Sequence, residues 1–170
     1  NLDDVVLSDN IKEIGMYVFT NHFNFNKKDN INYMKSHSND YFLLHSLETK
    51  QVSKINISNQ TKGIYWNSIS EIPTITELTI PSSIEFMGSR AISNCVNLRS
   101  VKISENLKSI ESYMFAGCNG LTEVTLPKSI EKINPIIPGV ILDVVNINEF
   151  LKKLSFPIKK YPQLPSVKHI

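Results

Sequence analysis

Cysteine and histidine are the residues of this sequence with the most distinctive chemistry, and their spacing limits what they can do. Cys95 and Cys118 lie far apart in the sequence and lack the paired spacing of a zinc site. Among the four histidines, only His37 and His45 lie close together, with Asp40 between them. A third strong ligand at helical spacing is missing. The pattern therefore favours solvated surface histidines over a metal centre.

Motifs for catalysis are absent from the sequence. It contains no phosphate-binding G-x-x-x-x-G-K-[ST] or G-x-G-x-x-G segment, no H-E-x-x-H and no G-x-S-x-G. With only six glycines in the chain, loops that cradle phosphate are not expected. The sequence predicts a protein without enzymatic activity and without a cofactor.

Charge and hydropathy exclude two classes of partner. The net charge is +2, and charges of both signs are spread along the chain, so no field is strong enough to hold nucleic acid or an anionic membrane. No apolar run reaches the length of about 20 residues that spans a bilayer, and no secretory signal is present. Because the sequence begins at Asn1 without a methionine, a leader or a neighbouring domain could have been removed, and the compartment stays open.

The feature that organises the chain is an internal repeat whose period equals the separation of Cys95 and Cys118. Three consecutive windows begin at Ile75, Leu98 and Leu121, and each has apolar residues at offsets 1, 4, 6, 10 and 13. A degenerate copy begins at Val52, and another begins at Leu2. This agreement predicts a solenoid of stacked coils.

Offsets 4 and 6 of each window alternate as the residues of a strand do, so we expect them to point inward while their neighbours point outward. One coil cannot bury its own apolar residues, but stacked coils place equivalent residues about 5 Å apart. After each strand, a segment such as 111–116 has two adjacent apolar residues among polar ones, which predicts a short helical turn on the outer face.

Both cysteines occupy offset 21, so Cys95 and Cys118 should lie one above the other and face the core. Two interpretations are open. A disulfide is possible in principle because one coil spacing falls within the Cα range that a bridge tolerates. A ladder of buried thiols is favoured, because parallel side-chain vectors suit packing better than bonding.

The pattern L-x-x-V-x-L-P-x-x-I-x-x-I, followed by [AM]-[FI]-x-x-C, resembles the 23-residue leucine-rich repeat of the Treponema and BspA-like surface-protein family. The resemblance covers residues 2–24 and 52–137. It implies a leucine-rich-repeat solenoid with a curved parallel β-sheet and short helical turns on its outer face. It also implies a role in adhesion or protein binding, a cell-surface or secreted location and no shared active site.

The repeat predicts one domain over residues 1–170, with irregular parts between and after its copies. We divide it into a first repeat at 1–24, an insertion or eroded repeat at 25–51, four repeats at 52–139 with the last incomplete, and a C-terminal cap and tail at 140–170. A short helix is expected over 40–48, and a last strand at 140–145 should precede a cap helix at 148–154. The 25–51 segment is either a binding lobe beside the sheet or a tolerated surface excursion whose apolar half packs on the core.

The C-terminal tail matches a short proline-rich pattern. Lys159, Pro162 and Pro165 fit the form of a ligand for an SH3-type groove, although lysine stands where arginine would hydrogen-bond better. The alternative is an ordered or frayed tail.

The exposed side of the sheet is the predicted binding face, built from outward offsets of each repeat. The candidate partner-binding residues are Lys54, Asn56, Glu77, Thr79, Arg99, Lys102, Glu123 and Thr125. Their mixed charges would give a protein partner electrostatic specificity, whereas the threonines by themselves simply suit exposed strands. The sequence thus predicts a non-catalytic protein-binding or adhesion module. The alternative is a structural, oligomerisation or capping segment of a larger protein.

Overall fold

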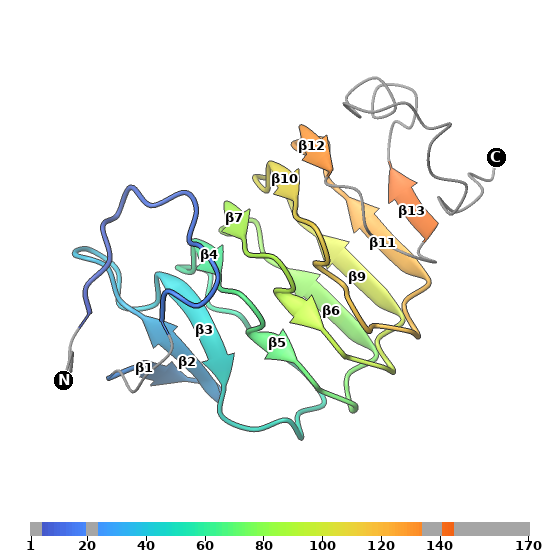
Figure 1. Ribbon diagram of the computed structural model, residues 1–170, viewed down its shortest axis with the longest axis horizontal. Coiled ribbons are helices and arrows are strands. Elements are labelled where there is room, and N and C mark those ends of the chain that lie inside the picture. Colours follow the sequence, from blue (N-terminus) through green and yellow to red (C-terminus); the bar gives the residue numbers. More distant parts are fainter. Residues whose placement is uncertain (1–4, 20–23, 134–140, 145–170) are drawn as a thin grey trace.

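The fold is a parallel β-solenoid of the leucine-rich-repeat type (Figure 1). The structure, a computed structural model, describes residues 5–19, 24–133 and 141–144. Each regular coil is one sequence repeat long and supplies short extended stretches that stack on the equivalent stretches of its neighbours. Three columns of stacked chain result, and they enclose the core.

The first column is a four-stranded parallel sheet. Its strands are β6 (Glu77–Ile80), β9 (Ser100–Ile103), β11 (Glu123–Leu126) and β13 (Ile141–Val144). Leu78 pairs with Val101, and Val101 pairs with Val124, each at the predicted displacement of one repeat. These residues are buried and their neighbours in the strands are more exposed, as the alternation at offsets 4 and 6 predicts.

Two further columns close each coil. The second contains β4 (Gly63–Ile64), β7 (Phe86–Met87), β10 (Ser109–Ile110) and β12 (Lys132–Ile133). The third contains β5 (Ile69–Ser70) and β8 (Ile92–Ser93), which pair in parallel. The Ile92 amide donates to the Met114 carbonyl and the Asn94 amide to the Ala116 carbonyl, so the third column continues into the next coil.

The main core lies inside these columns. It contains isoleucine, leucine and valine side chains contributed by equivalent positions of successive coils, such as Ile69 and Ile92 or Leu78 and Val101. Because each coil buries its apolar residues only against its neighbours, the repeat spacing in the sequence is what creates a continuous core.

Residues 25–51 lie within the sheet rather than beside it. They form β1 (Asn26–Lys28), β2 (Ile31–Met34) and β3 (Leu43–Leu47), which join β4 and β7 in a five-stranded sheet. β1, β2 and β3 pair antiparallel, and β3 then pairs in parallel with β4. The segment therefore caps the N-terminal end of the regular column with antiparallel strands (Figure 1).

The helix expected over 40–48 is wrong. β3 is extended because its neighbouring side chains are buried on opposite sides of the sheet: Leu44 belongs to the main core and Leu43 to a second cluster. A helix would place most of its apolar side chains on one face. The run of apolar residues that looked helical is a strand buried on both sides.

The second apolar cluster is covered by the N-terminal segment, residues 5–19. Its buried members are Leu7, Met34, Phe42, Leu43 and Tyr65. Ile11, Ile14 and Phe19 of the same segment pack against it. The Leu7 amide donates to the Lys35 carbonyl, and Leu7 forms a parallel bridge with Ser36. Apolar residues of the predicted first repeat thus pack the segment onto the coils, although Val18 of that repeat is exposed.

The predicted helical turns on the outer face are also wrong for the described residues, none of which is helical. Residues 112–117 form turns, and Tyr113 has a φ of 60°, a left-handed value that a right-handed helix cannot contain. The two adjacent apolar residues Met114 and Phe115 are both buried at the turn into the third column. The apolar residues of this segment do not recur with the 3.6-residue period of an amphipathic helix.

Of the predictions for the C-terminal part, the last strand falls within the described residues and the others fall outside them. β13 confirms a last strand, and it pairs with β11 at a displacement shorter than one repeat, as Val124 pairs with Leu142. The cap helix predicted at 148–154 and the SH3-ligand pattern with Lys159 lie outside the described residues. Within the described part of the chain, no helix is long and apolar enough to cross a membrane.

Candidate binding surface

The outward side chains of the four-stranded sheet form two rows in register. Glu77 stands beside Ser100, which stands beside Glu123, and these residues make the first row. The second row is formed by Thr79, Lys102 and Thr125. The stacking of parallel strands fixes this arrangement, because paired residues lie about 5 Å apart across the sheet. We call these two rows, together with Arg99, the outer sheet face.

The charged side chains of the outer sheet face are open to solvent. Glu77, Arg99, Lys102 and Glu123 are exposed. None of them has an ion-pair partner among the residues that the structure describes. Unpaired charges of both signs on one surface leave electrostatic interactions available to a partner.

Three of the eight predicted residues lie outside the strands of this sheet: Arg99 directly precedes β9, and Lys54 and Asn56 belong to the coil before β6. Lys54 and Asn56 are exposed, but residues 51–57 form no strand. That coil is linked to the next one by the Thr74 hydroxyl, which donates to the Val52 carbonyl at 2.6 Å. Six predicted residues therefore lie on the outer sheet face, and two lie on the irregular coil that precedes it.

The corners between the second and third columns hold residues that the sequence analysis missed. Tyr17, Asn67, Arg90 and Tyr113 have φ values of 61°, 55°, 55° and 60°, and all four occupy offset 16 of their repeats. A second position with positive φ, at offset 20, directly follows the third column and holds Glu71, Asn94 and Gly117. Positive φ costs most side chains about 1–3 kcal/mol, with asparagine and glycine the tolerant exceptions. Asn94 and Gly117, one repeat apart, were the signal for the offset-20 position, and Asn67 was the signal for offset 16.

Gly117 shows why the offset-20 corner is tight. Its φ is 72°, and a Cβ atom built on it would collide with the Asn94 side chain of the preceding coil. Glycine is therefore required there by both conformation and space.

A group of aromatic rings anchors the N-terminal segment to the sheet. The Phe19 amide donates to the Tyr65 hydroxyl at 3.1 Å, and the Phe19 and Tyr65 rings lie 5.5 Å apart. His45 stacks on Tyr65 at 5.2 Å and lies 4.6 Å from the Phe25 ring. Burial among these rings lowers the pKa of His45, because the charged imidazolium loses its hydration.

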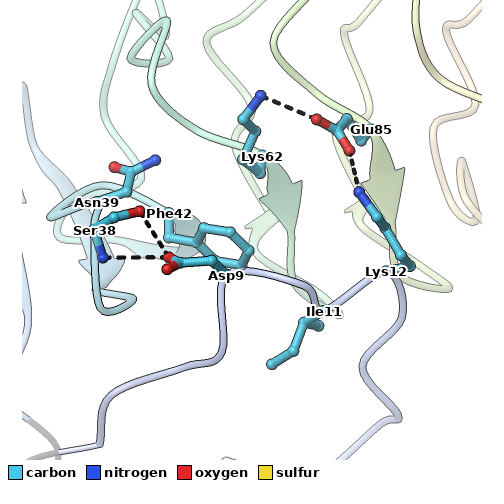
Figure 2. A pocket seen from close by; sticks show the side chains of 8 residues that line it. All are labelled: Asp9, Ile11, Lys12, Ser38, Asn39, Phe42, Lys62 and Glu85. Carbon is cyan, nitrogen blue, oxygen red and sulfur yellow. Dashed lines mark hydrogen bonds and ion pairs between the residues drawn. The ribbon is translucent and has the colours of Figure 1, made fainter.

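A shallow pocket of about 230 Å³ lies where the N-terminal segment crosses the second column (Figure 2). Lys12 and Lys62 each contact one carboxylate oxygen of Glu85, with Nζ to Oε distances of 2.6 and 3.0 Å. Hydrogen bonds from these two lysines lower the pKa of Glu85. Asp9 accepts hydrogen bonds from the amide and hydroxyl of Ser38 on the far side of the pocket. The charged groups of the pocket are thus paired with each other or hydrogen-bonded. They link the N-terminal segment to the coils and leave little unpaired charge for a ligand.

The cysteines stack as the repeat predicts. Cys95 and Cys118 are both buried and both free. Their sulfur atoms lie 3.7 and 3.8 Å from carbonyl oxygens of the coil below, those of Ile69 and Ile92. Hydrogen bonding to Cys95, together with burial, raises the pKa of the Cys118 thiol, which keeps it protonated at neutral pH. Of the two interpretations, the structure has the ladder of thiols.

The histidine pattern assembles no cluster in the described residues. His37 is exposed, and His45 is partly buried among aromatic rings. No group of three or more His, Cys, Asp or Glu side chains gathers within residues 5–19, 24–133 and 141–144 to hold a metal ion.

Stacked parallel coils, a ladder of inward leucine-type residues and a parallel sheet with an exposed outer face define a leucine-rich-repeat protein. The family model for the BspA-type leucine-rich repeat region matches six copies, over residues 1–51 and 44–137. The chain belongs to this family. No curated protein matches the sequence.

Solved structures share the fold at low identity. A leucine-rich repeat protein from Bacteroides capillosus is 22% identical with a TM-score of 0.58, and the match covers 72% of this chain and 99% of that one. The pneumococcal vaccine antigen PcpA is 21% identical with a TM-score of 0.51, over 61% of this chain and 28% of that one. A leucine-rich cell surface protein from Faecalibacterium prausnitzii is 19% identical with a TM-score of 0.51, over 86% of this chain and 43% of that one. These chains are similar in architecture.

Proposed function

We propose that this protein is a non-catalytic module that binds another protein on its outer sheet face. One observation supports this most directly: in-register rows of exposed Glu77, Glu123 and Lys102 side chains, with Arg99 beside them, lack intramolecular ion-pair partners among the described residues. A partner whose charges are arranged to match would gain specificity and a faster association rate from such a surface.

The relatives support a surface location for this role. The Faecalibacterium prausnitzii protein is described as a cell surface protein, and the pneumococcal protein as a vaccine antigen. By extension, we place this chain at the cell surface or in the secreted fraction and assign it a role in adhesion or protein recognition. We assign it no catalytic activity, in keeping with a family of binding and structural repeats.

The test removes positive charge from the outer sheet face. The full chain, the Arg99→Ala/Lys102→Ala variant and a Lys108→Ala/Lys132→Ala control, which removes the same charge from the second column, are used to capture proteins from an extract. Each captured protein is then purified and its Kd measured against all three chains. We expect at least about tenfold weaker binding to the Arg99→Ala/Lys102→Ala variant, with an unchanged melting temperature and unchanged binding to the control.

Two outcomes would contradict the proposal. Equal affinity for all three chains would remove the outer sheet face from the binding site. A concentration-independent oligomer of the unmodified chain, seen by light scattering and lost in the Arg99→Ala/Lys102→Ala variant, would assign the face to self-association instead.

A further inference from the structure

A second surface, with exposed aromatic and basic side chains, runs along the corner between the second and third columns. We call it the corner ridge, and its residues are Tyr17, Arg90 and Tyr113, which are exposed, and Trp66 and Asn67, which are partly buried. Asn67, Arg90 and Tyr113 occupy one position in three successive coils, and the Tyr17 ring lies 4.5 Å from that of Trp66. Tryptophan, tyrosine and arginine are the residue types that dominate binding energy at protein interfaces, whereas threonine and serine of the outer sheet face are not.

The backbone of the corner ridge makes these residue types unusual. Arg90, Tyr113 and Tyr17 have positive φ, which favours glycine or asparagine. Neither arginine nor tyrosine has the short polar side chain that makes this conformation easy for asparagine. Asn67 holds the same corner one coil away, so asparagine fits this geometry. The large side chains are therefore present despite the backbone, which points to a role outside the fold.

The Arg90 side chain is pre-positioned to bind an anion. Its guanidinium carbon lies 5.5 Å from the centre of the Tyr113 ring, and Tyr113 is 44% exposed. Stacking of this kind uses the face of a guanidinium and leaves its in-plane N–H donors free. Arg90 is exposed and has no carboxylate partner among the described residues. A pre-positioned, unpaired arginine is complementary to a carboxylate, which it can bind with two parallel hydrogen bonds.

We propose that the corner ridge binds an acidic peptide segment of a partner protein, in which a carboxylate pairs with Arg90 and a neighbouring apolar side chain packs on Tyr113. Tyr17 and Trp66 extend the apolar contact toward the N-terminal segment. Tyr17 is 64% exposed, and its neighbours Met16 and Val18 are exposed as well. The site is separate from the outer sheet face and does not depend on it.

The probe is a displayed library of random twelve-residue peptides, selected on the immobilised full chain and counter-selected on the Arg90→Asn/Tyr113→Asn variant. The asparagines remove both side chains while keeping a residue that tolerates the backbone, as Asn67 does. Glu71→Asn is the matched control, because it makes the same change at the offset-20 corner. The Arg99→Ala/Lys102→Ala variant reports separately on the outer sheet face.

We expect the selected peptides to contain Asp or Glu beside an apolar residue, and to bind the Arg90→Asn/Tyr113→Asn variant at least about tenfold more weakly than the unmodified chain. Glu71→Asn and Arg99→Ala/Lys102→Ala should bind them as the unmodified chain does. The melting temperature of Arg90→Asn/Tyr113→Asn should equal or exceed that of the unmodified chain. The proposal is overturned if no peptide is enriched, if amidating the peptide carboxylates leaves affinity unchanged, or if the double variant melts at a lower temperature.

Discussion

At the scale of single residues, Gly63 shows how closely the coils pack on the outer side of the second column. A Cβ atom on Gly63 would collide with the Phe86 ring of the next coil and lie 2.9 Å from Leu43 Cδ1 of the preceding strand. Phe86 packs against the second cluster, so its ring has little freedom to withdraw. The glycine is thus a packing requirement between adjacent coils.

Gly63→Ala should lower the free energy of unfolding by about 1–3 kcal/mol, the usual cost of forcing extra volume into a packed site. This exceeds the gain of about 0.4–1 kcal/mol that alanine brings by restricting the unfolded chain. Urea unfolding measures the difference. Gly15→Ala is the control, since a Cβ there meets only Val18 Cγ2 at 3.6 Å, and it should be neutral or slightly stabilising. Equal effects of the two substitutions would contradict the packing at Gly63.

His45 predicts a pH dependence of stability. Because burial lowers its pKa, the unfolded chain binds a proton more readily than the folded chain does. The stability linked to His45 is therefore complete above its ordinary pKa of 6.5 and declines as the pH falls below that value. Between pH 7.5 and 5.5, the free energy of unfolding should fall more steeply for the unmodified chain than for His45→Gln. The exposed His37→Gln variant should keep the steep slope, and parallel slopes for all three chains would refute the prediction.

Several single-residue features could be predicted from the sequence and others could not. The inward positions Leu78 and Val101 follow from alternation, which is a direct consequence of strand geometry. The positive φ of Arg90 and Tyr113 could not be predicted, because arginine and tyrosine do not indicate a left-handed backbone. Only the neighbouring copies, with Asn67 at the same offset, mark it. Where a residue type conflicts with its backbone conformation, residue propensities cannot predict that conformation, and only the structure shows it.

At the scale of elements, each of β6, β9 and β11 in the four-stranded sheet has a buried face toward the core and a solvent-exposed face on the outside. In β9, Val101 is 1% exposed and pairs with Leu78 and Val124, while its neighbour Lys102 is exposed. Adjacent residues of one strand therefore experience opposite environments.

The same replacement at these two positions should have very different effects. Val101→Thr exchanges a buried methyl group for a hydroxyl of nearly equal volume and should lower the free energy of unfolding by about 1–3 kcal/mol, since the hydroxyl loses water without a dedicated partner. Lys102→Thr should change it by no more than about 0.5 kcal/mol, because threonine suits an exposed strand. Thermal or urea unfolding compares them. Similar losses for both variants would mean that the outer sheet face is not open to solvent.

The elements also show where a sequence pattern is insufficient. The first column, with β6, β9 and β11, was predictable because these strands are buried on one side only and their residues alternate between inward and outward. The prediction of a helix over 40–48 fails at β3 because the apolar residues of this strand are buried on both sides, and a strand buried on both sides has no alternation of apolar and polar residues. The coil with Lys54 and Asn56 matched the template in apolar spacing but forms no strand. Spacing predicts which residues face inward, and pairing with neighbours decides whether a strand forms.

At the scale of the whole molecule, the described residues form two apolar clusters with different degrees of enclosure. The main core is lined by fully buried residues from every column, including Ile92, whose side chain is inaccessible. The second cluster is closed by the N-terminal segment, of which Ile11, Ile14 and Phe19 are only partly buried. The exposed ion pair between Lys12 and Glu85 adds little, since surface pairs contribute about 0–1 kcal/mol. The N-terminal segment should therefore open without unfolding the coils.

Native-state hydrogen exchange can measure this difference directly. The Leu7 amide, bonded to the Lys35 carbonyl, should exchange through local opening at a lower free energy than the Ile92 amide, bonded to the Met114 carbonyl. Ile11→Ala should speed exchange at Leu7 and leave Ile92 protected. Ile92→Ala removes a fully buried side chain, costs about 2–5 kcal/mol and should speed exchange across the coils. In a repeat solenoid, instability spreads only through the contacts that neighbouring coils share. If Ile11→Ala lowered the free energy of opening at the Ile92 amide as much as at the Leu7 amide, the two clusters would therefore form one cooperative unit, contrary to this prediction.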